Sequence, residues 1–429
     1  MPEAFIFAFL IPSKINMKNF ILVIAFLLTY AWSYSSSLQP DSTINKPKRN
    51  PILSFNFQSG AVLPTNDFIN NSDKKPTFTS ASLKFGYGST GDRWQDYAYG
   101  MPYVGIGLYF AQFFDERSLG KPFALYAYQG ATLTKISKKI NLNYEWNLGA
   151  SFNWRPYDPF DNPENIALGS STNVYVGLNL YFRWRLVNSW DLDFGVGVSH
   201  FSNGASHLPN KGLNLLSGLV SLNYSFYKAT TSAHATSTLK PPVIEPRIDY
   251  DLLINISSRQ RRFDTTRTNL PSEYLDKNFG VYGITFAPML VKNYKYKYGV
   301  GVDLLYDESI NAKAWREVNP ADGKLYNRIK LAPFNERIAL GFSIRGELTF
   351  PSYAIFANMG YNVIHKSLKD KRLYQVMGIK VNLKENFFGT FGIRANNFSK
   401  AQYLYWSLGY TFKGEPIYKI RKNIEKTFL

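Results

Sequence analysis

The sequence contains no cysteine and only four histidines among its 429 residues. The absence of cysteine excludes disulfide-stabilised folds, thiolate metal sites and cysteine nucleophiles. Four histidines leave little room for a histidine-based metal centre. We therefore expect a protein that requires no metal and no other cofactor.

Charged residues are also scarce, at 19% of the chain, whereas apolar residues make up 45% and aromatic residues 17%. This balance excludes a disordered or collagen-like chain. The formal net charge of +18 suits contact with anionic lipid phosphates. Because no zinc-ligand spacing, nucleic-acid recognition module or glycine-rich phosphate loop occurs, we expect no nucleic-acid partner.

Long hydrophobic runs are missing as well, since no stretch after the N-terminus reaches the 18 apolar residues of a membrane helix. Near the N-terminus, Lys18 precedes a short apolar run from Phe20 to Leu28, and small residues follow. This order predicts a cleaved export signal over residues 1–37, with Met17 as an alternative start. The other interpretation of this segment is an N-terminal anchor helix.

Strict alternation of apolar and polar residues is the strongest pattern in the chain. From residue 140 to 154 every second residue is apolar, and the same holds over 174–184 and 404–412, and over 338–350 apart from Gly346. Strands of ten or more residues with one apolar face are typical of membrane β-barrels, whereas soluble sandwiches have strands of about 5–6 residues. A β-sheet can span a lipid bilayer only when it closes into a barrel, because an open edge would leave backbone groups without hydrogen bonds. We therefore predict an all-β, transmembrane antiparallel β-barrel of the bacterial outer membrane.

About sixteen strands are expected, in two eight-strand units over residues 51–227 and 249–413. A polar lead-in (38–50), a Pro/Ser/Thr-rich linker (228–248) and a basic tail (414–429) complete the chain. The segment from Gly195 to Ser202 is similar to that from Phe391 to Ser399, with Asn397 in the place of His200. The second unit is therefore expected to be catalytically degenerate. One large barrel and two small ones both fit this pattern.

One short stretch, from His200 to Asn214, carries the chemistry. His200 and Ser202 share the apolar face of their strand, and Asn214 shares that of the next strand. The three polar side chains should meet on the lipid-facing outer wall near the extracellular rim, where polar groups are functional candidates. A histidine beside a serine can act as its base, and a third group can fix the imidazole tautomer. The alternative is a polar strand end that meets lipid headgroups.

This stretch resembles the lipid A 3-O-deacylase family, the PagL-type acyloxyacyl hydrolases, over about residues 53–227. The family pattern is His-x-Ser-Asn, then Pro-Asn-x-Gly, then a third triad member, and it implies an eight-strand barrel with its site on the outer wall. The resemblance implies Ser202 as nucleophile, His200 as general base and Asn214 as the third member. It further implies an oxyanion hole from Asn203, Gly204 and Ala205, and a loop shaped by Pro209, Asn210 and Gly212. Substrate acyl chains would lie against Phe194, Val196, Val198, Leu216 and Val220.

Asn214 departs from the family, which usually has glutamate there. An amide cannot offset imidazolium charge, which predicts a weaker enzyme or the recruitment of another carboxylate. The motif is also similar to outer-membrane phospholipase A, a calcium-dependent dimeric barrel with asparagine at this offset. Three hypotheses follow: a deacylase of lipid A, a phospholipase that needs calcium, and a non-catalytic structural or uptake barrel with a relic motif. The expected partner is lipid A or another membrane lipid, and the oligomeric state is left open.

Overall fold

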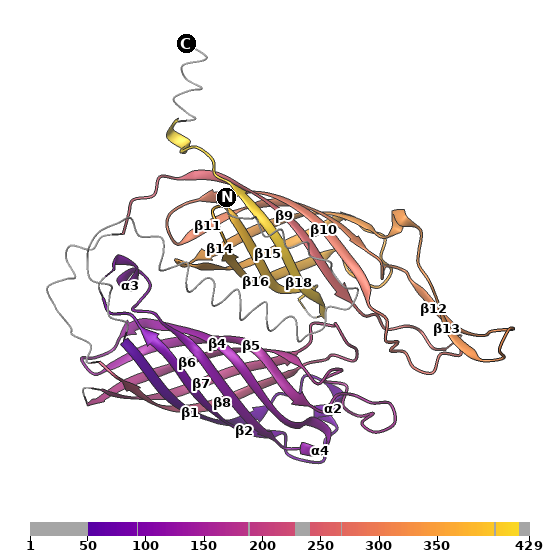
Figure 1. The fold of residues 1–429 in the computed structure, drawn as a ribbon, viewed down its shortest axis with the longest axis horizontal. Helices are drawn as coiled ribbons and strands as arrows, with labels where there is room; N and C mark the ends of the chain where they lie inside the picture. Colours follow the sequence, from indigo (N-terminus) through magenta and orange to yellow (C-terminus); the bar gives the residue numbers. More distant parts are fainter. Residues whose placement is uncertain are drawn as a thin grey trace, which may run out of the picture.

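The computed structural model describes residues 50–419, except 92, 188, 228–240, 267 and 399. The predicted export signal, most of the predicted linker and the end of the basic tail lie outside the described residues. The chain forms two closed antiparallel barrels of eight strands each (Figure 1). This confirms the all-β barrel prediction and decides for two small barrels. No helix in the described part of the chain is long and apolar enough to cross a membrane.

The first barrel closes because β1 pairs with both β2 and β8. Its strands are β1 (Asn50–Val62), β2 (Thr77–Gly88), β3 (Tyr103–Phe113), β4 (Gly120–Lys135), β5 (Ile140–Trp154), β6 (Asn173–Val187), β7 (Trp190–Ser202) and β8 (Leu213–Ser225).

The second barrel closes because β9 pairs with both β10 and β18. Its strands are β9 (Arg247–Arg259), β10 (Phe279–Val291), β11 (Tyr296–Asp307), β14 (Ile338–Thr349), β15 (Tyr353–Ile364), β16 (Leu373–Asn382), β17 (Phe387–Asn396) and β18 (Lys400–Phe412).

The two ends of each barrel differ in their connections. One end, here the long-loop end, carries α2 (Asp67–Asn70), α4 (Glu116–Leu119), the 3-10 helix η1 (Phe334–Glu336) and a separate hairpin of β12 (Lys313–Val318) and β13 (Leu325–Lys330). The opposite, short-turn end carries α3 (Trp94–Ala98), within the connection from β2 to β3. Figure 1 shows α2, α4 and the hairpin at the same end of the molecule and α3 at the other.

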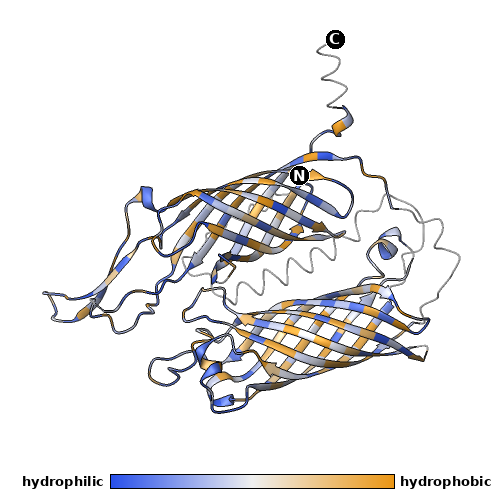
Figure 2. Ribbon diagram, turned by 180° about the vertical axis from the view of Figure 1, so that it is seen from behind, coloured by the Kyte–Doolittle hydropathy of each residue, from blue (hydrophilic) through white to orange (hydrophobic). Residues whose placement is uncertain are grey.

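The alternation of the sequence separates the outer wall of each barrel from its interior. On β1, Phe55 and Phe57 are exposed on the outer wall, whereas Asn56 and Gln58 are buried inside. Figure 2 shows hydrophobic residues recurring along the strands of both barrels. Eight-strand barrels are narrow enough for side chains to fill them. Ion pairs do so here, with Lys84 Nζ 2.9 Å from Glu145 in the first barrel and Arg345 2.6 Å from Asp303 in the second.

Alternation fails at the end of β5, where the sequence assigned Trp154 to the outer wall. Asn153 adopts a positive φ of 62°, which turns the next side chain inward. Trp154 is therefore buried and its indole lies 5.0 Å from the ring of Phe201.

The two barrels lie side by side, and side chains of β4, β5 and β6 meet the second barrel (Figures 1 and 2). On β4, the Gln129 amide oxygen accepts hydrogen bonds from the Trp146 indole, at 2.8 Å, and from the Tyr353 hydroxyl of β15. Val174 of β6 packs with Phe391 and Leu404 of the second barrel.

The connection from β2 to β3, which contains α3, also takes part in the contact between the barrels. The Tyr99 hydroxyl donates to the carbonyl of Thr349 at 2.8 Å, and its ring lies 5.2 Å from that of Phe350. Burial, together with the neighbouring Tyr294, raises the pKa of Tyr99 to about 12, so the hydroxyl keeps its proton and remains a donor. The barrels are thus held together at this end by α3 and its connection.

Candidate active site

The outer wall at the long-loop end of β7 and β8 carries the predicted site. His200 pairs with Asn214 across these strands, and Ser202 pairs with Val174 of β6. Val196 and Val198, which precede them on the same face, are 54% and 46% exposed. The inward neighbour Phe201 is fully buried and stacks on Tyr175 at 5.0 Å, which anchors the end of the strand.

Three side chains form a continuous hydrogen-bonded chain on this wall. His200 Nε2 lies 2.8 Å from Ser202 Oγ, and His200 Nδ1 lies 2.7 Å from Asn214 Oδ1. These are the distances of ordinary hydrogen bonds. The two strands thus bring together the serine, histidine and asparagine that the sequence singled out. The structure shows this contact, and the catalytic roles of the three residues stay predictions.

The loop after the neighbouring strand β1 fixes the orientation of the asparagine. Asn214 Nδ2 donates to Thr65 Oγ1 at 2.8 Å, so Oδ1 is the atom that faces the imidazole. A carbonyl oxygen can only accept, and therefore the proton of the neutral ring sits on Nδ1. The lone pair of Nε2 is then directed at the Ser202 hydroxyl, which is the tautomer that a general base needs.

Gly212 packs directly against the imidazole. A Cβ at this position would lie 2.7 Å from His200 Cε1, and the φ of 75° also favours glycine. The carbonyl of Gly212 accepts a hydrogen bond from Asn66 Nδ2 at 3.0 Å, and its amide donates to Ala167 at 2.9 Å. These two hydrogen bonds hold the backbone of Gly212 against the imidazole ring of His200.

Residues 203–212, here the site loop, join β7 to β8. The Asn203 side chain is fully buried, and its Nδ2 donates to Ser170 Oγ at 3.0 Å and to the carbonyl of His207 at 2.9 Å. Its backbone amide donates to Asn210 Oδ1 at 3.0 Å. Both side-chain protons of Asn203 are therefore engaged in holding the loop, so this side chain offers no free donor for an oxyanion hole.

Gly204 and Ala205 remain as sources of oxyanion-hole donors. Both adopt positive φ angles, 60° and 62°, and their backbone amides have no acceptor among the residues that the structure describes. Asn210 shapes the loop through Asn203, and buried Pro209 packs within it, since its carbonyl would lie 2.6 Å from a Cβ at Gly169.

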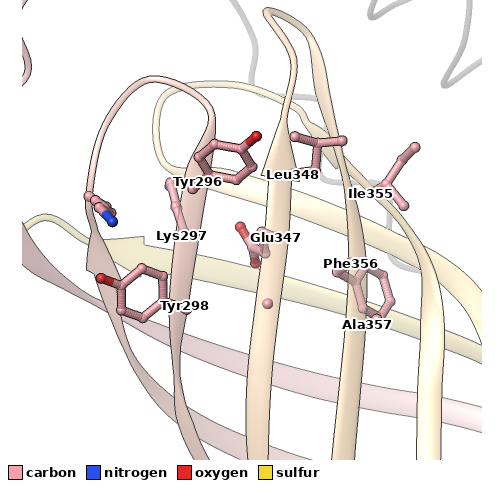
Figure 3. A pocket seen from close by; sticks show the side chains of 10 residues that line it. Tyr296, Lys297, Tyr298, Glu347, Leu348, Ile355, Phe356 and Ala357 are labelled. Atoms are coloured by element: carbon pink, nitrogen blue, oxygen red, sulfur yellow. The ribbon is translucent and has the colours of Figure 1, made fainter. Parts of the chain in front are cut away.

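The side chains expected to contact acyl chains all lie on the outer wall. Their exposed fractions run from 41% to 54% for the set Phe194, Val196, Val198, Leu216 and Val220. A hollow of about 470 Å³ lies elsewhere, at the short-turn end of the second barrel, lined by Tyr296, Leu348 and Ile355 among others (Figure 3). It contains none of the triad residues, so we do not assign it to the substrate.

Several residues at the site were missed by sequence reasoning, notably Thr65, Asn66, Ser170 and, in the second barrel, Gln260. They come from three separate segments, and no motif near His200 points to them. In the second barrel the seventh strand is β17, as the sequence comparison with β7 implied. It ends at Asn396, and Asn397 follows with a φ of 51° in a turn. Ser399, the counterpart of Ser202, lies outside the described residues.

Two family models match the sequence. One, for lipid A 3-O-deacylase (PagL), matches residues 75–223, and the other, for the C-terminal domain of acyloxyacyl hydrolase, matches residues 248–414. The chain belongs to the PagL family. The first match contains the three hydrogen-bonded side chains, the second covers the other barrel, and the PagL-like fold indicates the outer membrane. Among curated proteins, no sequence matches this chain.

Solved outer-membrane barrels are similar to this chain at low identity. The outer membrane enzyme PagL is 14% identical, with 39% of this chain and 97% of that one covered and a TM-score of 0.29. Neisserial surface protein A is 10% identical, with 41% and 97% covered and a TM-score of 0.29. The Pseudomonas putida toluene transporter TodX is 8% identical, with 91% and 93% covered and a TM-score of 0.18.

Proposed function

We propose that this protein is an outer-membrane serine esterase that removes an ester-linked acyl chain from lipid A. The observation that carries the proposal is the chain of hydrogen bonds from Asn214 through His200 to Ser202 on the outer wall of a PagL-family barrel. A soluble hydrolase would expose such a site to water. Here it lies among exposed apolar side chains, where membrane lipids would present their esters.

In the proposed reaction, Ser202 Oγ attacks the acyl carbonyl carbon while His200 Nε2 takes the hydroxyl proton. Amides of Gly204 and Ala205 stabilise the negative charge on the carbonyl oxygen. The tetrahedral intermediate then collapses, the sugar oxygen leaves with the proton from His200, and an acyl-serine remains. Water, deprotonated by His200, hydrolyses that ester and releases the fatty acid.

The site requires no metal or cofactor for these steps. Asn214 holds the imidazole in the correct tautomer but brings no negative charge to balance the imidazolium that forms. The second hydrogen-bond partner of Asn214, the hydroxyl of Thr65, is also neutral. Within the described ranges no carboxylate bonds to His200 or Asn214, so we propose a working but slow enzyme.

Substrate binding would combine the apolar wall with positive charge. Acyl chains would lie along Val196, Val198 and Leu216, which are about half exposed. Lys211 of the site loop is exposed beside the triad and would approach a lipid phosphate. An export signal over residues 1–37, removed after transport, would deliver the chain to the outer membrane.

The test is mass spectrometry of lipid A from cells that make the wild type or Ser202→Ala. We expect one acyl chain to be lost only with the wild type. Asn214 favours a second candidate, a phospholipase A, which would instead release lysophospholipid and be suppressed by calcium chelation. If neither lipid pool changes with the folded wild-type protein, the non-catalytic barrel is the correct interpretation.

A further inference from the structure

The second barrel touches the site loop of the first. The carbonyl of Ala205 accepts a hydrogen bond from the backbone amide of Gln260 at 3.0 Å, and the Leu208 amide donates to Gln260 Oε1 at 2.9 Å. Gln260 follows β9, so both bonds cross from one barrel to the other. Its Nε2 is held in turn by Asp276 at 3.1 Å.

An apolar contact lies beside these bonds. A Cβ at Gly204 would lie 2.5 Å from Leu404 Cδ2 and 3.2 Å from Ile393 Cδ1, which are side chains of β18 and β17. Gly204 and Ala205 are buried as a result. The two residues whose amides would face the oxyanion are thus the two that the second barrel covers.

The contact between the two barrels ends next to Ser202. Val174, the pairing partner of Ser202 on β6, is only 6% exposed because it packs on Phe391, whereas Val176 on the same face is 44% exposed. The seam between the barrels therefore runs along one side of the nucleophile and leaves the other side open.

We propose that the second barrel is a working part of the active site, in which Gln260 and Leu404 are positioning residues that hold residues 204–208. This inference rests on the proposed esterase function. The first barrel braces the loop at its two ends, through the bonds of Ser170 to Asn203 and of Asn66 and Ala167 to Gly212. Without the second barrel, the positive φ angles at Gly204 and Ala205 would lack support on their other side.

The experiment is the labelling kinetics of the full-length protein with a fluorophosphonate, a probe that needs no knowledge of the lipid. Ser202 Oγ bonds to phosphorus, fluoride leaves, and the hydroxyl proton passes to His200. The final labelled fraction reports how much protein is folded, whereas the rate constant reports the nucleophile and the oxyanion hole. A merely structural contact would change the final labelled fraction but not the rate constant.

We expect Gln260→Met, which keeps the side-chain length but removes the acceptor, and Leu404→Ala each to slow labelling about tenfold at full final labelling. The matched control is Leu408→Ala, four residues further along the same face of β18 and 56% exposed, which should label at the wild-type rate. Unchanged rate constants in both test variants, or a loss of labelled fraction alone, would overturn the proposal.

A double-mutant cycle tests the contact itself. Gly204→Ala should slow labelling because its methyl group would collide with Leu404, and adding Leu404→Ala should give a smaller loss than the product of the two single losses. Independent effects would contradict the contact. A wild type that labels no faster than Ser202→Ala would instead contradict the esterase function, so the two failures are distinguishable.

Discussion

Thr65 accepts a hydrogen bond from Asn214 over 2.8 Å, and this bond decides which end of the Asn214 amide faces His200. The two residues lie 149 positions apart, and the pairing of β1 with β8 brings the loop after β1 to the start of β8. An amide that rotated by half a turn would present N–H groups to Nδ1 and leave the proton on Nε2. The site would then contain the same three residues but lack a base.

The first prediction concerns this orientation. Thr65→Val keeps the shape of the side chain but removes the acceptor, so part of the protein should hold the amide in the reversed orientation. We expect kcat for ester hydrolysis to fall about three- to tenfold while KM stays unchanged, since a net hydrogen bond is worth about 1 kcal/mol. Thr65→Ser should retain the wild-type kcat, and a valine variant that did so as well would remove the role assigned to Thr65.

The second prediction concerns charge. Asn214→Asp keeps the acceptor atom toward His200 and adds the negative charge that the transition state lacks. We expect kcat to rise about tenfold, and Asn214→Ala to lower it about a hundredfold, because the alanine leaves the ring without an orienting partner. The measurement is steady-state hydrolysis of a short-chain ester by purified protein. A slower aspartate variant would show that the site is tuned to a neutral third residue.

The third prediction concerns Gly212. Gly212→Ala would place a methyl group 2.7 Å from His200 Cε1 and displace the ring from Ser202. A misplacement of about 1 Å can cost about a hundredfold in rate, and we expect a loss of that size with the barrel still folded. The matched control is Gly323→Ala, in the connection of the β12–β13 hairpin. It has a similar φ of 65° and nothing within 4 Å, so the same backbone strain arises without contact to the site.

The fourth prediction concerns the contact between the barrels away from the site. Tyr353→Phe removes the hydroxyl that donates to Gln129 and should lower the free energy of unfolding by about 0.5–1 kcal/mol, as for other polar contacts within membranes. Tyr361→Phe, on the same strand but 51% exposed, should leave it unchanged. Urea unfolding in detergent measures both. Equal stabilities would indicate that this hydrogen bond adds nothing to the packing around it.

Alternation predicted the strands because one face must avoid water and the other must fill a narrow interior. Where that rule holds from the first residue of a strand, as in β5 from Ile140 onward, the predicted start agrees with the structure. It weakens at strand ends. At the start of β2, which begins at Thr77, the apolar Phe78 points inward and the polar Thr79 outward, against the pattern of the other strands.

The contacts between the barrels could not be read from the alternation. Gln129 occupies an outward position of β4, where a polar side chain looks like an exception to the pattern. It is 3% exposed because the second barrel covers it. The period of a strand tells which side chains face outward, but not which of them meet lipid and which meet another protein surface. Leu404 was missed at the candidate site for the same reason, whereas Gln260 lies beyond the end of β9, where no alternation applies.

Both barrels belong to one polypeptide, so their stoichiometry in the bilayer is fixed at one to one. Two separate proteins would have to find each other by lateral diffusion, and their association would weaken when few copies are made. Here Gln260 stays within reach of Ala205 at any expression level. The turnover per molecule should accordingly be the same in sparsely and densely populated membranes.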